Sequence, residues 1–234
     1  ATIIGHANLN LGDQVEPVLQ ALQAASPNRF RGIRHSVTWD AEVTSTAAHN
    51  MPGQLGTDNF RAGARLLAKM GLSLEGWLFF RQLPELADFA KAVPDLTIIL
   101  NHVGGLLREG VYANRDDEIL PIWRSGIAAV AACPNVVIKL GGMGMPANGF
   151  DWHTRTQPIG SEELAESMAP FMNYCIEQFG PGRCMFESNF PPDKVSYSYN
   201  VLFNAFKRLS KGYSASERAA LFHDTAARVY RIDV

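Results

Sequence analysis

The chain has 234 residues, of which 47% are hydrophobic and 19% charged, which is the composition of an ordinary globular enzyme with a sizeable core. Its formal net charge of −2 gives no electrostatic reason to bind nucleic acid or a membrane surface, and no apolar run approaches the roughly 18 residues of a transmembrane helix. The three cysteines lack CxxC spacing and lie in apolar or helical contexts, so we expect free thiols in a reducing compartment and a cytoplasmic protein.

Six strands, each followed by helical sequence, are predicted in chain order. The strands are expected at residues 2–6, 30–37, 72–79, 96–100, 136–140 and in a run that begins at 184. The helices are expected at residues 14–25, 58–70, 83–93, 119–132, 161–179, 198–210 and 214–230. The strands are continuous hydrophobic runs rather than alternating ones, which favours a parallel sheet buried on both faces.

This alternation predicts the α/β class and a TIM (β/α)8-type barrel, of which six β/α units are visible, in a single domain over residues 1–234. The chain opens inside an apolar strand, with no methionine and no preceding cap. Because a complete barrel needs eight strands, we expect the first two strands to be absent from this sequence. The exposed strand edges that this leaves favour a homodimer.

The most informative stretch runs from Cys184 to Lys194, where an apolar run becomes polar and ends in a double proline. Because side chains alternate along a strand, we expect Glu187 and Asn189 to share one face. A carboxylate and an amide at the end of a buried strand are costly without partners, and at the mouth of an α/β barrel such positions carry catalytic groups.

Two long polar loops, at residues 38–59 and 145–160, are of a length that is usually functional. Trp39 and Trp152 lie in them and are candidates for an aromatic substrate pocket. His6 ends the first strand and could line the mouth of the barrel. Arg31 and Arg34 lie three apart on one strand, so at most one of them points inward.

Three segments together resemble the amidohydrolase superfamily in its amidohydrolase-2 branch. They are Phe30-Arg31-Gly32-Ile33-Arg34, Ile99-Leu100-Asn101-His102-Val103-Gly104-Gly105 and Arg183-Cys184-Met185-Phe186-Glu187-Ser188-Asn189-Phe190-Pro191. The branch contains hydrolases, lactonases, decarboxylases and hydratases that act on small, often carboxylate-bearing compounds. The resemblance therefore implies a barrel enzyme with a small-molecule substrate.

The resemblance also implies roles for individual residues. His102 would polarise a substrate carbonyl or hold a hydrolytic water, the alternative being a core histidine bonded to a neighbouring carbonyl. Arg34 matches the arginine of the family's fourth strand and suits a bidentate grip on a substrate carboxylate, with Arg81 as a second anion contact. His35 then faces away from Arg34, toward a helix.

Asn189 stands where the family has a catalytic aspartate. Glu187, two residues deeper, could take over the carboxylate role with a pKa raised by burial. The alternative is a structural ion pair between Glu187 and a buried arginine or Lys139. The sequence leaves both interpretations of Glu187 open.

Departures from the family pattern concern the metal. The family's His-x-His pair is not in this sequence, the segment Trp77–Gln82 contains no histidine, and Asn189 is a poor metal ligand. We therefore expect a hydrolase that opens a lactone or ester in a small carboxylated substrate without a tightly bound metal or other cofactor. The alternatives are a zinc-dependent decarboxylase or hydrolase of the same branch, which would use His102, and a non-catalytic barrel that binds a small acid.

Overall fold

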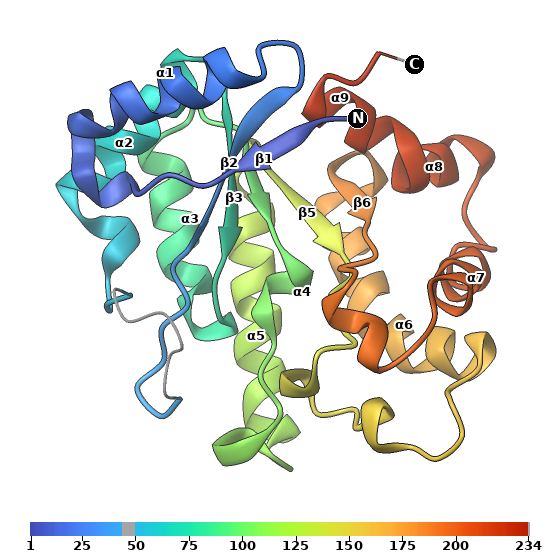
Figure 1. The fold of residues 1–234 in the computed structure, drawn as a ribbon. Helices are drawn as coiled ribbons and strands as arrows, with labels where there is room; N and C mark the ends of the chain where they lie inside the picture. Colours follow the sequence, from blue (N-terminus) through green and yellow to red (C-terminus); the bar gives the residue numbers. More distant parts are fainter. Residues whose placement is uncertain (44–49, 234) are drawn as a thin grey trace.

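The computed structural model describes residues 1–43 and 50–233, and within them six parallel strands form one sheet in the sequential order β1-β2-β3-β4-β5-β6 (Figure 1). The strands are β1 (Ile3–Gly5), β2 (Phe30–Ser36), β3 (Ser73–Trp77), β4 (Ile98–Leu100), β5 (Val136–Leu140) and β6 (Cys184–Phe186). All five neighbouring pairs are parallel, as the continuous hydrophobic runs predicted. The carboxyl ends of the strands therefore meet at one edge of the sheet.

Helices connect the strands and close the chain. They are α1 (Glu16–Ala25), α2 (Asp58–Lys69), α3 (Leu83–Ala92), α4 (His102–Gly105), α5 (Asp116–Ala131), α6 (Ser161–Phe179), α7 (Tyr199–Leu209), α8 (Ala215–Ala219) and α9 (Thr225–Tyr230). Side-chain caps set several of their starts: the Thr57 hydroxyl accepts from the Phe60 backbone N–H, and Ser214 with Glu217 forms a capping box. Part of the loop predicted at residues 38–59 lies outside the described residues.

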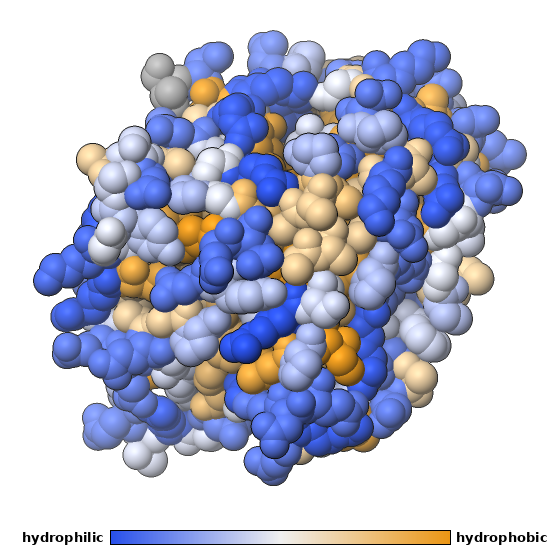
Figure 2. Space-filling view, turned by 180° about the vertical axis from the view of Figure 1, so that it is seen from behind, coloured by the Kyte–Doolittle hydropathy of each residue, from blue (hydrophilic) through white to orange (hydrophobic). Residues whose placement is uncertain are grey.

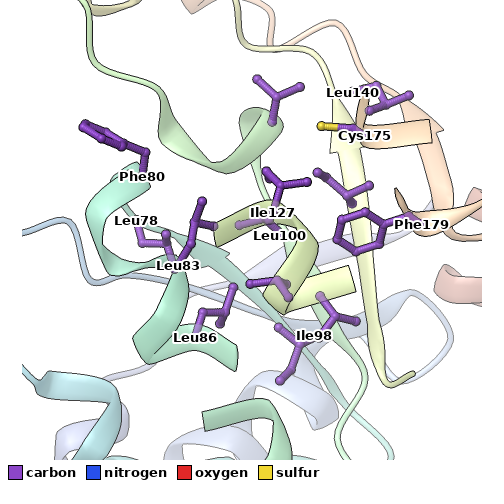
Figure 3. Close-up of a cluster of buried hydrophobic side chains, with 14 of the residues drawn as sticks. Leu78, Phe80, Leu83, Leu86, Ile98, Leu100, Ile127, Leu140, Cys175 and Phe179 are labelled. Carbon is purple, nitrogen blue, oxygen red and sulfur yellow. The ribbon is translucent and has the colours of Figure 1, made fainter. Parts of the chain in front are cut away.

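Figure 2 shows the face opposite to the one seen in Figure 1. Most of this face is hydrophilic, with hydrophobic side chains in separate patches. This is expected when amphipathic helices turn their apolar sides inward. The main core lies between the sheet and these helices. Figure 3 shows part of it, where Ile98 and Leu100 of β4 lie near Leu83 and Leu86 of α3 and Ile127 of α5.

A second, smaller cluster fills the opposite, inner face of the sheet. Ile99, Val137 and Met185 pack there against Tyr230 of α9, with Ile4 of β1 at its edge. Neighbouring strands lie about 4.8 Å apart, so the first and sixth strands of a flat sheet would be some 24 Å apart. Their contribution to one small cluster shows that the sheet curves around the inner face, as a barrel wall does.

Within the described part of the chain, no helix combines the length and the apolar character that crossing a bilayer requires.

Candidate active site

A network of charged side chains crosses the inner face of the sheet near the carboxyl ends of the strands. It runs from Arg34 on β2 to Glu75 on β3, Lys139 on β5 and Glu187 directly after β6, and it ends at His102, two residues after β4. The period of two along each strand turns Arg34, Glu75 and Lys139 inward and leaves residues such as Leu74 and Ile138 in the main core. Five elements therefore bring their polar groups to one region.

Within this group of charged side chains, Glu75 accepts the most hydrogen bonds, and it is only 2% exposed. Its Oε2 accepts from Arg34 Nε at 2.9 Å and Nη2 at 2.6 Å, and its Oε1 accepts from Lys139 Nζ at 2.9 Å and the Tyr230 hydroxyl at 2.6 Å. Burial alone would raise the pKa of this carboxyl, but the charges of Lys139 and Arg34 and the Tyr230 hydrogen bond lower it to about 2. Glu75 is thus a fixed anion around which three donors are held.

Glu187 joins this network to His102. Its Oε1 lies 2.6 Å from His102 Nδ1 and accepts the His102 backbone N–H at 3.2 Å, while its Oε2 lies 3.7 Å from Lys139 Nζ. Burial would raise the pKa of the Glu187 carboxyl, but His102, Lys139 and Arg34 outweigh it and the pKa is lowered. The sequence expectation of a raised pKa is therefore wrong, because it counted burial and not the cations around the carboxylate.

The backbone around His102 adopts an uncommon conformation. His102 has φ 53° and the β-branched Val103 has φ 46°, both in the left-handed region that costs about 1–3 kcal/mol for such residues. The two bonds from Glu187 hold His102 in this geometry. Gly142 after β5 permits it, since a Cβ at Gly142 would lie 2.6 Å from the His102 side chain.

A cleft of about 900 Å³ opens on the inner face beside this network. Arg34, Glu75 and Lys139 line its wall, and Glu187, which is not among the lining residues, lies 3.7 Å from Lys139 Nζ. The other polar lining residues are His6, Asn8, Asn10, His35, Ser36 and Asn50. The cleft therefore has a charged wall and a rim of neutral hydrogen-bonding groups.

Arg34 and His6 both line the cleft, as the sequence predicted for each of them. Arg34 points into the cleft and its side chain is 41% exposed, so part of its guanidinium is open to a ligand even though Glu75 holds the other part. His6 Nδ1 lies 3.1 Å from the Arg34 carbonyl oxygen. His35 also borders the cleft, but it is buried and its ring packs on Phe60 of α2, as expected.

The strand alternation that predicted a shared face for Glu187 and Asn189 does not extend to Asn189. The strand ends at Phe186, and Asn189 turns through a left-handed conformation with φ 49°. Its amide then donates to Asp193 Oδ1 at 2.7 Å. Asp193 is fully buried, also accepts from the Gly144 N–H and the Tyr197 hydroxyl, and has a pKa that burial raises. Asn189 thereby belongs to a cluster that joins the loops after β5 and β6.

Three further candidates lie away from the cleft. Arg81 and Trp39 line a separate pocket of about 350 Å³, where Arg81 donates to the Tyr112 hydroxyl at 3.0 Å and to Glu118 at 2.8 Å. Trp152 is buried and stacks on Phe150, with ring centroids 4.3 Å apart. The structure thus does not bring these three residues together with Arg34 and His102.

Sequence reasoning missed Glu75, Asp193 and Tyr230. A usable signal existed for Glu75, since it is a lone carboxylate inside the apolar run at residues 72–79, and such a group needs a buried partner. Asp193 follows two prolines and has the sequence context of an ordinary loop residue. Tyr230 lies 155 residues from its partner Glu75, and no local pattern connects the two.

The described residues do not fit a metal centre. Among them, no group of three or more His, Cys, Asp or Glu side chains is arranged to hold a metal ion. The polar groups nearest the cleft are already bonded to one another, as Glu187 is to His102 and Glu75 to Lys139. The expectation of an enzyme without a tightly bound metal stays a prediction.

Comparisons with known proteins give a consistent picture. The family model described as Amidohydrolase matches residues 1–232. The uncharacterized protein y4mH of Sinorhizobium fredii is 35% identical over 230 residues, which cover 98% of this chain and 69% of that protein. The L-fucono-1,5-lactonase of Burkholderia multivorans is 29% identical over 206 residues, which cover 87% of this chain and 64% of that enzyme. The chain thus spans about two thirds of these relatives.

A solved structure extends the comparison to the fold. The crystal structure of an amidohydrolase from Burkholderia multivorans with bound zinc superposes with a TM-score of 0.80 at 26% identity, over 100% of this chain and 74% of that one. This match confirms the expected α/β barrel architecture with six of its β/α units. It also agrees with the family resemblance that the three sequence segments carry.

Proposed function

This chain belongs to the Amidohydrolase family, and from that premise we propose that it is a hydrolase that opens the lactone ring of a small, hydroxylated substrate. The observation that carries the proposal is the 2.6 Å contact between Glu187 and His102 Nδ1. An ionised carboxylate only accepts hydrogen bonds, so His102 Nδ1 is the donor, and in the tautomer of neutral imidazole that this bond selects the lone pair lies on Nε2. A histidine oriented in this way by a carboxylate can act as a general base.

In the proposed reaction, the oxygen of a water molecule bonds to the lactone carbonyl carbon while one of its protons moves to His102 Nε2. The ring C–O bond then breaks and the ring oxygen takes the proton from His102, so that one lactone and one water give one hydroxy acid. Glu187 stabilises the imidazolium that forms between the two steps. Lys139 lies in the cleft wall, where its ammonium can stabilise the negative charge on the carbonyl oxygen.

The cleft favours a neutral, hydroxylated lactone over a highly charged substrate. The two charges of Arg34 and Lys139 are balanced by Glu75 and Glu187 together, whereas the rim offers the uncharged side chains of Asn8, Asn10 and Ser36. Hydroxyl groups both donate and accept, which suits amide and hydroxyl side chains. A relative that is an L-fucono-1,5-lactonase supports the same substrate class.

The exposed part of Arg34 favours a second class, lactones that carry a carboxylate. The test is therefore a panel that contains L-fucono-1,5-lactone, D-glucono-1,5-lactone and a carboxylated lactone, with acid release followed by a pH indicator. We expect hydrolysis of at least one hydroxylated lactone. The His102→Ala substitution should lower kcat/KM on the order of 1,000-fold and Glu187→Gln on the order of 100-fold or more.

The matched control is His223→Ala, because His223 is exposed and, within the described ranges, its ion-pair partner is its neighbour Asp224. It should leave kcat/KM unchanged. The proposal fails when the wild-type protein hydrolyses none of the lactones, or when the His102→Ala protein is as active as the His223→Ala protein.

Zinc-dependent hydrolysis or decarboxylation is the second candidate, because the amidohydrolase structure with the TM-score of 0.80 contains zinc. Elemental analysis of the purified protein, with the lactone panel repeated after chelation, separates the two candidates. Stoichiometric zinc together with a loss of turnover on chelation favours the metal-dependent reaction, and unchanged turnover after chelation favours the metal-free one.

A further inference from the structure

Asn101 presents a buried amide whose hydrogen-bonding capacity is unused. The residue directly follows β4, it is 0% exposed, and neither its Oδ1 nor its Nδ2 has a hydrogen-bond partner among the described residues. No other side chain of the described residues has buried polar atoms in this state. An unpaired buried amide costs free energy, so its presence calls for a reason.

The backbone turns this amide toward the candidate site. Asn101 has extended torsions of φ −82° and ψ 149°, so the alternation of β4 continues and its side chain lies on the inner face with that of Ile99. Extending the strand register by one residue sets Asn101 beside Trp77 of β3 and Lys139 of β5. His102 is the next residue in the chain.

We propose that Asn101 is a ligand-binding residue of this site and that its amide holds a hydroxyl group or a water molecule during the reaction. A carboxamide with both ends free offers two donor hydrogens and an acceptor oxygen. A hydroxyl group or water satisfies both ends because it donates and accepts, whereas a carboxylate can only accept. The inference rests on the proposed lactone hydrolysis, which supplies two such groups: the attacking water and the hydroxyls of the substrate.

The test compares two asparagines that differ in their bonding. Asn135 Nδ2 donates to three backbone carbonyls, of Ala90, Val93 and Leu96, so Asn135→Ala removes these bonds and should lower the urea midpoint of unfolding. Asn101→Ala removes no bond within the protein and should shift the midpoint clearly less. Its kcat/KM should nevertheless fall on the order of 100-fold, while Asn135→Ala keeps the wild-type value per folded molecule.

The kinetic constants distinguish the two sources of the bound group. A fall in kcat at constant KM identifies the attacking water, and a rise in KM identifies a substrate hydroxyl. Asn101→Leu, which fills the space with apolar atoms, is the second variant and should lose activity in the same way.

Two outcomes overturn the assignment: wild-type kcat/KM in a folded Asn101→Ala or Asn101→Leu protein, or a midpoint for Asn101→Ala that falls as far as that of Asn135→Ala. The unfolding measurement needs no turnover, so it tests Asn101 even when no lactone is hydrolysed. A wild-type protein that hydrolyses lactones together with fully active Asn101 variants would leave the proposed function standing and remove only this inference.

Discussion

Replacing Glu75 by glutamine removes the anion that holds three donors on the inner face of the sheet. The shift of the Glu75 pKa from 4.5 to about 2 corresponds to about 3 kcal/mol of stability at neutral pH. Removing one partner of a buried ion pair typically costs about 3–5 kcal/mol. Arg34 is 41% exposed and can turn to water, whereas Lys139 keeps the longer contact to Glu187 and its position 5.7 Å from the centre of the Tyr230 ring. We therefore expect Glu75→Gln to lower the free energy of unfolding by about 3 kcal/mol at pH 7.

The sign of the pH dependence adds a second check. Because the folded-state pKa of Glu75 is lowered, its contribution is fully present above the unfolded-state pKa of 4.5 and is lost as the pH falls toward about 2. The difference between the wild-type and Glu75→Gln proteins in urea unfolding, followed by circular dichroism, should therefore shrink between pH 5 and pH 2.

The control is Glu163→Gln, which breaks a 2.7 Å ion pair with Arg155 in which both side chains are exposed. Such surface pairs contribute about 0.2–1 kcal/mol. The reasoning is refuted when Glu75→Gln costs no more than Glu163→Gln at pH 7, or when its cost does not change with pH.

Two further predictions concern His35 and the turn after His102. Burial and the neighbouring His6 lower the pKa of His35 to about 4. The wild-type protein should therefore lose about 3 kcal/mol of its free energy of unfolding as the pH falls from 6.5 to 4. The His35→Gln protein should lose less over the same range, as measured by urea unfolding. At Gly105, with φ 64°, an added Cβ would lie 1.8 Å from a backbone carbonyl oxygen, whereas Gly110, with φ 60°, has open space around it. Gly110→Ala should cost about 1–2 kcal/mol and Gly105→Ala clearly more; equal melting temperatures for the two variants would contradict this steric argument.

The strands and helices were predictable because their signals are local. The run at residues 136–140 is a buried strand by composition alone, and it forms β5 (Val136–Leu140). Alternation also gave the correct facing of Arg34 and His35, since both lie well inside β2. The fold class followed from the repeated order of such segments.

The site was less predictable because its bonds depend on register and on turns. The pairing of Glu75 with both Arg34 and Lys139 joins β2, β3 and β5, and the sequence does not state how far each strand is shifted against the next. The shared face predicted for Glu187 and Asn189 depended on the same kind of information. The strand ends three residues before Asn189, and one left-handed residue is enough to redirect a side chain that alternation would have turned inward. Positions in loops, such as Trp39 and Trp152, follow tertiary packing rather than local pattern.

The bond between Tyr230 and Glu75 has a consequence for protein synthesis. The two residues are 155 positions apart, and Tyr230 is the last residue of the closing helix α9. A ribosome releases the chain from its amino end, so β3 emerges long before the hydroxyl that completes the shell around its carboxylate. Until then Glu75 can be held only by Arg34 and, once β5 has emerged, by Lys139. The growing chain can therefore assemble its outer core early, but the charged wall of its cleft becomes complete only when α9 has left the ribosome.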